Sequence, residues 1–352
     1  MRGFPVFVLG GSGYVAGEVI RLILGHPQLE LAGIASDGQP GTPVEAAFPH
    51  LAPRLDGRSF LSYEALTAAA RGYANPAVIS AAPHGASAGI IARLLGDLAA
   101  TGTRATVVDL SADFRFADPL AYENTYGHPH GAPDLQQHFT CAVPEHLSRA
   151  ATPHVAHPGC FSTAILLASV PLLALGLVEP RLFVSAVTGS TGSGRQPTEG
   201  THHPRRHSDL YAYNPLTHRH TPEITALAEA ASGVAGEFAF VPHSGPFARG
   251  IHATVQARLH EPARADALRA RLREFYAGSA FVSIVETCPR LKDVVTSNHA
   301  RLGIASDGHT VVVTSVIDNL VKGAAGGGIQ WLNRLLGFDE TAGLTGLAAG
   351  WT

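Results

Sequence analysis

Up to residue 110, short apolar runs alternate with segments that carry apolar residues at helical spacing. The runs have the length and composition of strands buried on both faces of a sheet. They are Phe4 to Leu9, Glu30 to Ala35, Ala77 to Ala81 and Val107 to Leu110. Strands that alternate with helices in this way predict an α/β fold with a doubly wound parallel sheet, whose ligands gather at the carboxyl ends of the strands.

Beyond residue 180 the pattern changes, because runs rich in β-branched and aromatic residues follow one another with few helices between them. One long helix is expected over Ala263 to Tyr276. This half is therefore predicted to be α+β with a mixed or antiparallel sheet. Its expected strands are Leu182 to Val187, Phe238 to Val241, Ile251 to Leu259, Phe281 to Glu286 and Val311 to Ile317.

Two stretches depart from both patterns. Tyr122 to Phe139 is polar and interrupted by prolines, and we expect a loop there. Gly323 to Gly328 is rich in glycine and leads into an expected helix over Ile329 to Leu336. Because each glycine weakens a helix start, close approach to another backbone or to a cofactor is the expected compensation.

Composition narrows the class of protein. The chain has 352 residues, of which 45% are hydrophobic and 15% charged, and this is enough for two domains with sizeable cores. A net charge of −3 gives no electrostatic reason to expect nucleic acid or a membrane surface as a partner. Three cysteines argue against a disulfide framework and for a reducing compartment, and no apolar run is long enough to span a bilayer. We therefore expect a cytoplasmic protein.

A glycine turn lies between the first strand and its helix. Gly10, Gly13 and Ala16 form Gly-x-x-Gly-x-x-Ala, a variant of the dinucleotide fingerprint in which backbone amides approach a pyrophosphate at a helix N-terminus. A glycine-rich turn without a ligand is the alternative. Ser36 and Asp37 stand at the end of the second strand, where three interpretations are open. Asp37 favours NAD if its carboxylate binds the ribose hydroxyls, whereas Ser36 could instead donate a hydrogen bond to a phosphate. In the third interpretation Asp37 only caps a turn.

One cysteine has the setting of a nucleophile. In His157-Pro158-Gly159-Cys160 a Pro-Gly turn stops the preceding segment, and small and hydroxyl residues then lead from Cys160 into the apolar run Ile165 to Leu175, which is typical of a helix. Cys160 therefore falls in the first turn of the expected helix. There the unpaired amides and the positive end of the helix favour a thiolate. The alternative is a buried cysteine that packs as a small hydrophobe.

A histidine is placed to act as a base. Thr221 as N-cap, with Pro222 as the first helical residue, predicts a helix start directly after His220. The positive helix end disfavours the imidazolium and keeps the ring neutral, as a general base requires. The chain has nineteen histidines, but their spacing matches none of the usual zinc patterns, so no metal is expected.

Three features are candidate anion sites. Arg115 follows the strand Val107 to Leu110, and the alternative is a surface ion pair with Asp113 or Asp118. The loop from Thr188 to Gln196, which includes Ser190 and Arg195, offers amides and hydroxyls to an anion unless it is a flexible surface loop. Arg249 stands before a strand, where it binds an anion or is solvated.

Several of these motifs, taken together and in order, resemble the N-acetyl-gamma-glutamyl-phosphate reductase family of arginine biosynthesis. The resemblance runs from end to end of the chain. Its motifs are the first glycine turn, Pro83-His84-Gly85, Asp109 to Arg115, His157 to Cys160, His218 to Ile224, and Asp318 to Gly326.

The resemblance implies an NADP-dependent reduction of a small acyl phosphate to an aldehyde. It implies a Rossmann domain over residues 1–156 with 324–352, and a catalytic domain of the aspartate-semialdehyde dehydrogenase kind over 157–323. Cys160 would be the nucleophile, His220 the acid/base residue, and Asn319 a neighbour of the nicotinamide. The arginines Arg115 and Arg249, with Ser190, would bind the substrate. The dinucleotide would lie on Gly10, Ser12, Gly13, Tyr14, Val15 and Ser36.

Three points remain open in this resemblance. Many relatives have a basic residue where this chain has Asp37, which leaves NAD as an alternative to NADP. A sister group reduces aminoadipate phosphate on a carrier protein in lysine biosynthesis, but His157-Pro158 favours the arginine enzyme. A non-catalytic nucleotide-sensing protein on the same fold is the remote alternative, although it has no use for Cys160 or His220. The mixed sheet expected in the second domain could pair across a dimer, and a homodimer or homotetramer is expected.

Overall fold

The computed structural model describes residues 3–350, which divide into two compact units. The first contains the residues up to Cys141, Arg149–His157 and Ala325–Thr345. The second contains Ala142–Ser148, Pro158–Ala324 and the described residues from Gly346 onward. The sequence-based division had placed 142–148 and 346–350 with the first unit.

A six-stranded parallel sheet forms the centre of the first unit. Its strand order is β2-β1-β3-β4-β6-β5, so the chain reverses direction across the sheet between β1 and β3, as in doubly wound folds. The strands are β1 (Phe4–Leu9), β2 (Leu29–Ala35), β3 (Ala77–Ser80), β4 (Thr106–Asp109), β5 (Phe139–Cys141) and β6 (His154–Ala156). The predicted α/β parallel sheet is confirmed.

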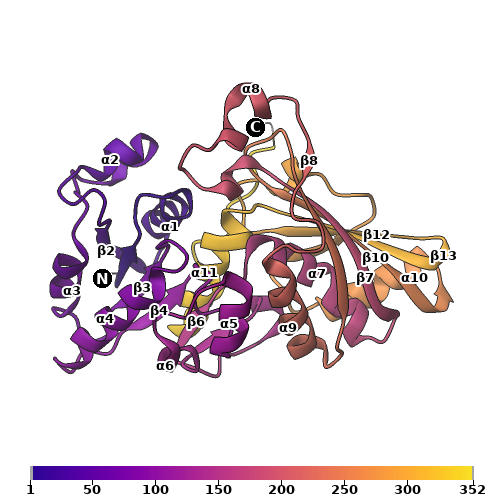
Figure 1. The fold of residues 1–352 in the computed structure, drawn as a ribbon, viewed down its shortest axis with the longest axis horizontal. Coiled ribbons are helices and arrows are strands. Elements are labelled where there is room, and N and C mark those ends of the chain that lie inside the picture. Colours follow the sequence, from indigo (N-terminus) through magenta and orange to yellow (C-terminus); the bar gives the residue numbers. More distant parts are fainter. Residues whose placement is uncertain (1–2, 351–352) are drawn as a thin grey trace. The chain divides into compact units, whose positions relative to one another are not determined.

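Helices cover both faces of this sheet (Figure 1). Phe7 and Leu9 share one apolar cluster with side chains of α3 and α4, while Val108 lies against the glycine-rich start of α11. Alternate residues of a strand point to opposite faces, which explains why these runs are apolar throughout. The helices are α1 (Tyr14–Gly25), α2 (Val44–Ala47), α3 (Tyr63–Ala70), α4 (Ser87–Ala99) and α11 (Gly326–Leu335), with a 3₁₀ turn η1 (Pro49–Arg54).

The expected loop over Tyr122 to Phe139 is wrong in part, because helices α5 (Pro119–Tyr126) and α6 (Pro133–Gln136) lie in or overlap it. The Asp118 carboxylate accepts a hydrogen bond from the N–H of Leu120, Pro119 occupies the first turn, and Gly127 ends α5 with φ of 76°. These are start and stop signals that local sequence contains. The segment lacks the amphipathic spacing on which the loop prediction relied.

A seven-stranded mixed sheet dominates the second unit, which confirms the α+β prediction for this half. Its order is β11-β12-β13-β10-β7-β9-β8, with β7–β9 and β11–β12 parallel and the other pairs antiparallel. Strand β12 had no counterpart in the prediction. The strands are β7 (Val178–Thr188), β8 (Tyr211–Ala212), β9 (Glu237–Ser244), β10 (Ile251–Ala263), β11 (Val282–Val285), β12 (Ala300–Ser306) and β13 (Gly308–Ile317).

Helix α7 (Cys160–Ala174) is the core of this unit. Every residue from Phe161 to Leu173 is buried, and a helix that is apolar on all sides must be enclosed by other elements. It packs on β7, β10 and β13 and contacts α9 (His220–Ser232) and α10 (Ala265–Phe275) (Figure 1). Its first residue, Cys160, is thereby fixed at the end of a rigid element.

The glycine-rich segment contains a short π-helix, Val321–Ala325, that precedes α11. The predicted helix over Ile329 to Leu336 begins three residues earlier, at Gly326. A π-helical turn is rare and is often found at functional sites. Within the described residues, no helix is both long enough and apolar enough to cross a membrane.

Candidate active site

Cys160 is the first residue of α7, and Gly159 is its N-cap with extended backbone (φ −59°, ψ 153°). The side chain of Cys160 is only partly buried, so a reagent can reach it. The amides of the first helical turn and the positive helix end favour a negative charge at this position. The geometry therefore fits a thiolate better than it fits a small buried hydrophobe.

Glu223 holds the backbone next to the thiol. Its carboxylate, which is almost completely buried, accepts a hydrogen bond of 2.7 Å from the N–H of Gly159. Glu223 lies one turn beyond His220 on α9, so one carboxylate links the helix of the expected base to the residue before the expected nucleophile. In the local sequence, the spacing of three residues from His220 is the one signal that marks Glu223.

Gly323 of the π-helix packs closely against the Cα and Cβ atoms of Cys160. A Cβ atom at Gly323 would lie 2.7 Å from the Cβ of Cys160 and 3.1 Å from its Cα. Such a contact is closer than side chains tolerate, so only glycine fits here. Lys322, the preceding residue, is fully buried and forms an ion pair of 2.6 Å with Glu145. The expectation that these glycines serve a close approach is therefore met at Gly323 by the Cys160 backbone.

His220 is buried and is the first residue of α9, with Arg219 as N-cap. The predicted start with Thr221 as N-cap is wrong by two residues, because His220 and Thr221 are already helical. The imidazole nevertheless lies in the first turn, where the helix end disfavours a positive charge. Its ring is 6.2 Å from that of Phe161, the residue after Cys160.

His218 contacts His220 through a hydrogen bond and through its ring. Its Nδ1 accepts a hydrogen bond of 3.1 Å from the backbone N–H of His220, and the two rings lie edge to face at 4.7 Å. Burial, followed by the positive charge of Arg219, lowers the pKa of His218 to about 4. His218 is therefore neutral near pH 7, with its proton on Nε2 because Nδ1 is the acceptor.

Tyr213 is a neighbour of His218 in the second unit. Burial, together with the negative charge of a Cys160 thiolate, raises the pKa of the Tyr213 hydroxyl. The phenol therefore stays protonated and can donate a hydrogen bond. Its ring packs edge to face on His218 at 5.7 Å, which places an O–H donor in the neighbourhood of the thiol and the histidines.

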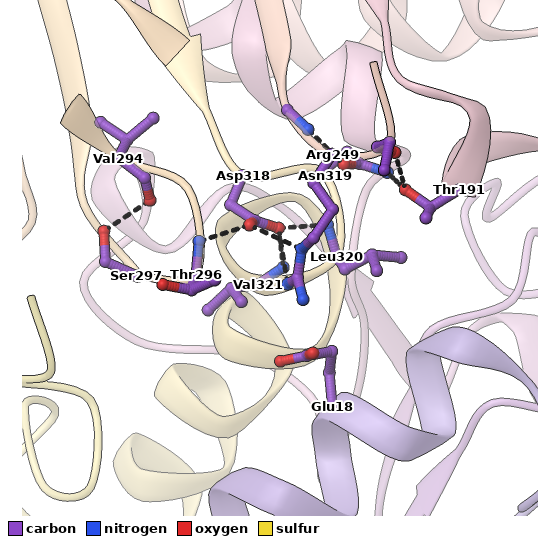
Figure 2. A network of polar contacts seen from close by, with 12 residues as sticks. Glu18, Thr191, Arg249, Val294, Thr296, Ser297, Asp318, Asn319, Leu320 and Val321 are labelled. Atoms are coloured by element: carbon purple, nitrogen blue, oxygen red, sulfur yellow. Dashed lines mark hydrogen bonds and ion pairs between the residues drawn. The ribbon is translucent and has the colours of Figure 1, made fainter. Parts of the chain in front are cut away.

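Arg249 does not have the setting of a solvated or substrate-facing residue. Its Nε and Nη2 donate to the two carboxylate oxygens of Asp318, at 3.0 and 3.2 Å (Figure 2). The side chain is about one-fifth exposed, whereas that of Asp318 is fully buried. This paired arrangement argues against the expected role of Arg249 as a substrate anchor, because the fork that would bind an anion is occupied by Asp318.

Asn319 uses both ends of its amide within the second unit. Its Oδ1 accepts a hydrogen bond of 2.7 Å from the N–H of Gly250, and its Nδ2 donates to Thr191 Oγ1 at 3.0 Å (Figure 2). The loop with Ser190 is a 3₁₀ turn, Ser190–Ser193, in which the N–H of Ser190 bonds to the carbonyl of Phe247. This ordered turn differs from the flexible loop that was the alternative.

The glycine turn of the first unit fits a dinucleotide. Gly10 has φ of 69°, and a Cβ there would lie 2.4 Å from the backbone of Ala82. Gly13 is the N-cap of α1, and no atom of the described chain lies within 4 Å of the place its Cβ would occupy. The first turn of α1, with Tyr14 exposed and Val15 beside it, therefore presents its amides in open space, as a pyrophosphate requires.

Ser12 and Ser36 meet at the ends of their strands. Ser36 is buried and its hydroxyl donates to Ser12 Oγ at 3.2 Å, while the neighbouring Asp37 is exposed. The two serines therefore lie together at the carboxyl ends of β1 and β2, where doubly wound folds bind the adenosine ribose. The position of Asp37 is compatible with each of the interpretations given above.

Arg115 is buried in the first unit, whereas the alternative had placed it at the surface. Its Nε donates to the carbonyl of His157 at 3.1 Å and its Nη2 to that of Leu110 at 3.3 Å. These two carbonyls hold the guanidinium in place beside His157. Arg115 thus retains the properties of an anion anchor.

Metal ligation has no support in the described part of the chain, where no group of three or more His, Cys, Asp or Glu side chains is arranged to hold an ion. No disulfide joins the three cysteines among the described residues. The second unit therefore brings together a helix-start thiol and two buried histidines, and the first unit contains a glycine turn at a helix start.

Comparison with known proteins gives this arrangement a family. The chain is 39% identical to N-acetyl-gamma-glutamyl-phosphate reductase of Rhodospirillum rubrum over 96% of either chain. It is 39% identical to the enzymes of that name from Nitrosococcus oceani and Frankia casuarinae, over 97% of this chain and 98% of each relative. Residues 5–151 match the semialdehyde dehydrogenase NAD-binding domain, and residues 160–319 match the dimerisation domain of the same group.

Solved structures agree on the fold. Aspartate semialdehyde dehydrogenase II from Vibrio cholerae aligns with a TM-score of 0.67 at 14% identity, covering 95% of this chain and 99% of that one. A probable aspartate-semialdehyde dehydrogenase from Pseudomonas aeruginosa aligns with a TM-score of 0.64 at 19% identity over 95% and 99%. The resemblance inferred from the motifs is confirmed: the chain belongs to the N-acetyl-gamma-glutamyl-phosphate reductase family and has the fold of the semialdehyde dehydrogenases.

Proposed function

We propose that this chain reduces N-acetyl-glutamyl 5-phosphate to N-acetyl-glutamate 5-semialdehyde and phosphate with NADPH, in arginine biosynthesis. The observation that carries the proposal is the start of α7, where Cys160 stands at a positive helix end between Glu223-bound Gly159 and Gly323. Full-length relatives with the corresponding name support the choice of substrate.

The reaction begins at the thiol. The Cys160 thiolate attacks the acyl carbon, the bond from that carbon to the phosphate oxygen breaks, and a thioester on Sγ remains. First-turn amides of α7 stabilise the negative charge that develops on the acyl oxygen. The dinucleotide, when bound, supplies the hydride that reduces the thioester to the oxidation level of an aldehyde. The tetrahedral oxyanion left by hydride addition takes a proton from solvent and becomes a thiohemiacetal. His220 then accepts the hydroxyl proton of the thiohemiacetal as the bond to Sγ breaks, the aldehyde leaves and the Cys160 thiolate is restored.

The first unit supplies the dinucleotide site in this proposal. Gly10, Gly13 and the first-turn amides of Tyr14 and Val15 would hold the pyrophosphate, and the Ser12–Ser36 pair would face the adenosine ribose. A hydroxyl donor at this position suits a 2′-phosphate, which favours NADP, whereas Asp37 would repel one. One structural neighbour, the Candida albicans aspartate semialdehyde dehydrogenase, was solved with NADP.

Anion anchors complete the substrate site. Arg115 is our candidate for one acidic group of the substrate, because the carbonyls of His157 and Leu110 hold its planar guanidinium in a fixed orientation. The turn of Ser190 offers hydroxyls and amides for another. The matched dimerisation domain suggests a homo-oligomer, and we propose a homodimer or homotetramer. A catalytic thiol requires a reducing compartment, so we place the reaction in the cytoplasm.

The test is a spectrophotometric assay of purified protein. N-acetylglutamyl phosphate should oxidise NADPH, and the semialdehyde with phosphate should reduce NADP⁺. Cys160→Ala should abolish both directions, while Cys288→Ala, which alters an exposed cysteine of the same unit, should leave them unchanged. Full activity of Cys160→Ala would refute the mechanism.

Substrate and cofactor choice are tested in the same assay. The rates are also measured with NADH in place of NADPH. Faster turnover with NADPH would mean that Ser36 sets the cofactor preference, and faster turnover with NADH would mean that Asp37 does. Activity that appears only with carrier-linked aminoadipate phosphate would replace the proposal by the lysine enzyme. Absence of turnover with every acyl phosphate, together with retained dinucleotide binding, would favour the nucleotide-sensing alternative.

A further inference from the structure

The carboxylate of Asp318 is a hub of the second unit (Figure 2). It is fully buried at the end of β13 and accepts two hydrogen bonds from Arg249. It also accepts bonds of 2.6 Å from the N–H of Thr296, 2.8 Å from that of Leu320 and 2.9 Å from that of Val321. Five donors satisfy the acceptor capacity that a buried ionised carboxylate must fill.

These donors come from three separate segments of the chain. Arg249 precedes β10, Thr296 lies between β11 and β12, and the N–H groups of Leu320 and Val321 open the π-helix. One side chain therefore fixes three segments against one another. Neutralising the charge of Arg249 would not require the N–H groups of the other two segments. The contacts of Asp318 therefore also fix the positions of those segments.

The backbone of Thr296 indicates a constraint of this kind. Its φ is 73°, in the left-handed region that β-branched residues rarely adopt. The short hydrogen bond from its N–H to Asp318 is the contact that accompanies this conformation. Backbone strain of this sort persists only where the surroundings enforce it, and it occurs preferentially at functional sites.

The hub bears directly on Asn319. This residue follows Asp318, and its amide is held by Gly250, next to Arg249, and by Thr191 (Figure 2). When Asp318 fixes Arg249 and the N–H groups after Asn319, the position of the amide between them is fixed as well. In the proposed function this amide lies near the nicotinamide.

The hub also bears on Cys160. The backbone carbonyl of Asp318 accepts the N–H of Gly323 at 3.0 Å, and Gly323 is the residue that packs on the Cβ of Cys160. The side chain of Asp318 holds the start of the π-helix and its carbonyl holds the middle. The turn that packs against the Cα and Cβ atoms of Cys160 is thus anchored twice by the same residue.

We propose that Asp318 is a positioning residue for the reductase, which sets the Asn319 amide and the turn over Cys160, and that Arg249 acts through Asp318 instead of binding substrate. This inference rests on the proposed function for its catalytic consequence. It assigns Arg249 to the positioning network, and it leaves Arg115 as the anion anchor.

The primary test is Asp318→Asn. The amide is isosteric and keeps one acceptor oxygen, but its NH₂ group replaces the second acceptor that faces Thr296 and Arg249. We expect kcat to fall by about tenfold to a hundredfold, as misplacement of reacting groups by a fraction of an ångström does, with KM for the acyl phosphate changed by less than about threefold. The matched control is Glu237→Gln, which removes the exposed partner of Arg181 in the same sheet and should change neither constant.

Arg249 separates positioning from substrate binding. In the positioning network, Arg249→Leu lowers kcat, Arg249→Lys restores part of it because a cation remains beside Asp318, and the double variant Arg249→Leu with Asp318→Asn is no worse than the poorer single variant. Arg249→Lys also serves as the milder perturbation if Asp318→Asn folds poorly. A substrate anchor would instead raise KM in Arg249→Leu, and that loss would multiply with the loss caused by Asp318→Asn.

A readout without substrate distinguishes failure of this inference from failure of the proposed function. The rate of Cys160 alkylation by iodoacetamide, followed by mass spectrometry across pH, reports the position and ionisation of the thiol. Asp318→Asn should change this profile severalfold whether or not N-acetylglutamyl phosphate is the substrate. Unchanged alkylation and unchanged kcat in folded Asp318→Asn, or a rise in KM alone for Arg249→Leu, would overturn the inference.

Discussion

Replacement of Gly323 by alanine tests the closest contact of the site. The new Cβ would lie 2.7 Å from the Cβ of Cys160, whereas ordinary contacts begin at 3.4 Å. The two backbones must therefore separate by about 0.7 Å (3.4 − 2.7) for the methyl group to fit. Because α7 is enclosed on all sides, the displacement falls on the π-helix and on the first turn of α7.

The magnitudes predict a large effect on rate and a small one on stability. A forced methyl group costs about 1–3 kcal/mol by overpacking, and alanine regains up to about 1 kcal/mol over glycine in a helical conformation. The net loss of unfolding free energy is thus about 0–3 kcal/mol. Misplacement of a reacting group by close to 1 Å, in contrast, costs about a hundredfold in kcat.

The assay for Gly323→Ala is steady-state NADPH oxidation together with urea unfolding. Gly278→Ala, in the same unit, is the matched control, because apart from its chain neighbours no described residue has an atom within 4 Å of the Cβ position of that glycine. We expect kcat of Gly323→Ala to fall by roughly two orders of magnitude while the protein remains folded. A kcat within about twofold of the control would refute the argument that this contact holds the thiol in place.

Three further outcomes are expected. Glu223→Ala should lose about 1–3 kcal/mol of unfolding free energy in urea, because the buried N–H of Gly159 loses its acceptor. Gly10→Ala should abolish NADPH binding in fluorescence titration, since φ of 69° and a contact of 2.4 Å leave no room for a methyl group. Unfolding free energy should also fall from about pH 6.5 towards pH 4. Burial lowers the pKa of His146 and His218, both in the second unit, to about 4. In this pH range the unfolded chain therefore binds protons that the native chain does not.

Each outcome has a matched comparison. Glu229→Ala, at an exposed site on α9, should leave stability nearly unchanged, and an equal loss in both variants would remove the argument for Glu223. Gly89→Ala, on a helix of the same unit with open space around it, is the control for Gly10, and retained NADPH affinity in Gly10→Ala would contradict the turn geometry. Burial raises the pKa of Asp109 in the first unit to about 6, which has the opposite sign, so constant stability over this pH range would mean that the histidines do not dominate.

Local sequence was sufficient for much of the site. Cys160 was placed in a first helical turn from Pro158-Gly159 and the apolar run after it, and the structure has it as the first residue of α7. The glycine turn was recognised because strand, glycines and helix follow one another within a few residues. Both are short-range features, and their signals lie in adjacent residues.

Other features have no local signal. Strand β12 contains Gly303, which weakens a strand pattern, and only pairing with β11 and β13 makes it a strand. The α5 segment was assigned to a loop because it lacks amphipathic spacing, although its caps were readable. Arg249 was expected to bind an anion, and nothing in its neighbourhood in sequence indicates that its anion is Asp318.

Periodicity, capping and motif order are properties of consecutive residues, and they were enough to predict the two fold classes, the family and the expected nucleophile. The surroundings of that nucleophile depend instead on contacts between residues far apart in the chain. Glu223 is 64 residues from Gly159, and Asp318 is 69 residues from Arg249. Such pairs meet because strands and helices are packed into one core, and the energies that bring them together belong to the whole unit.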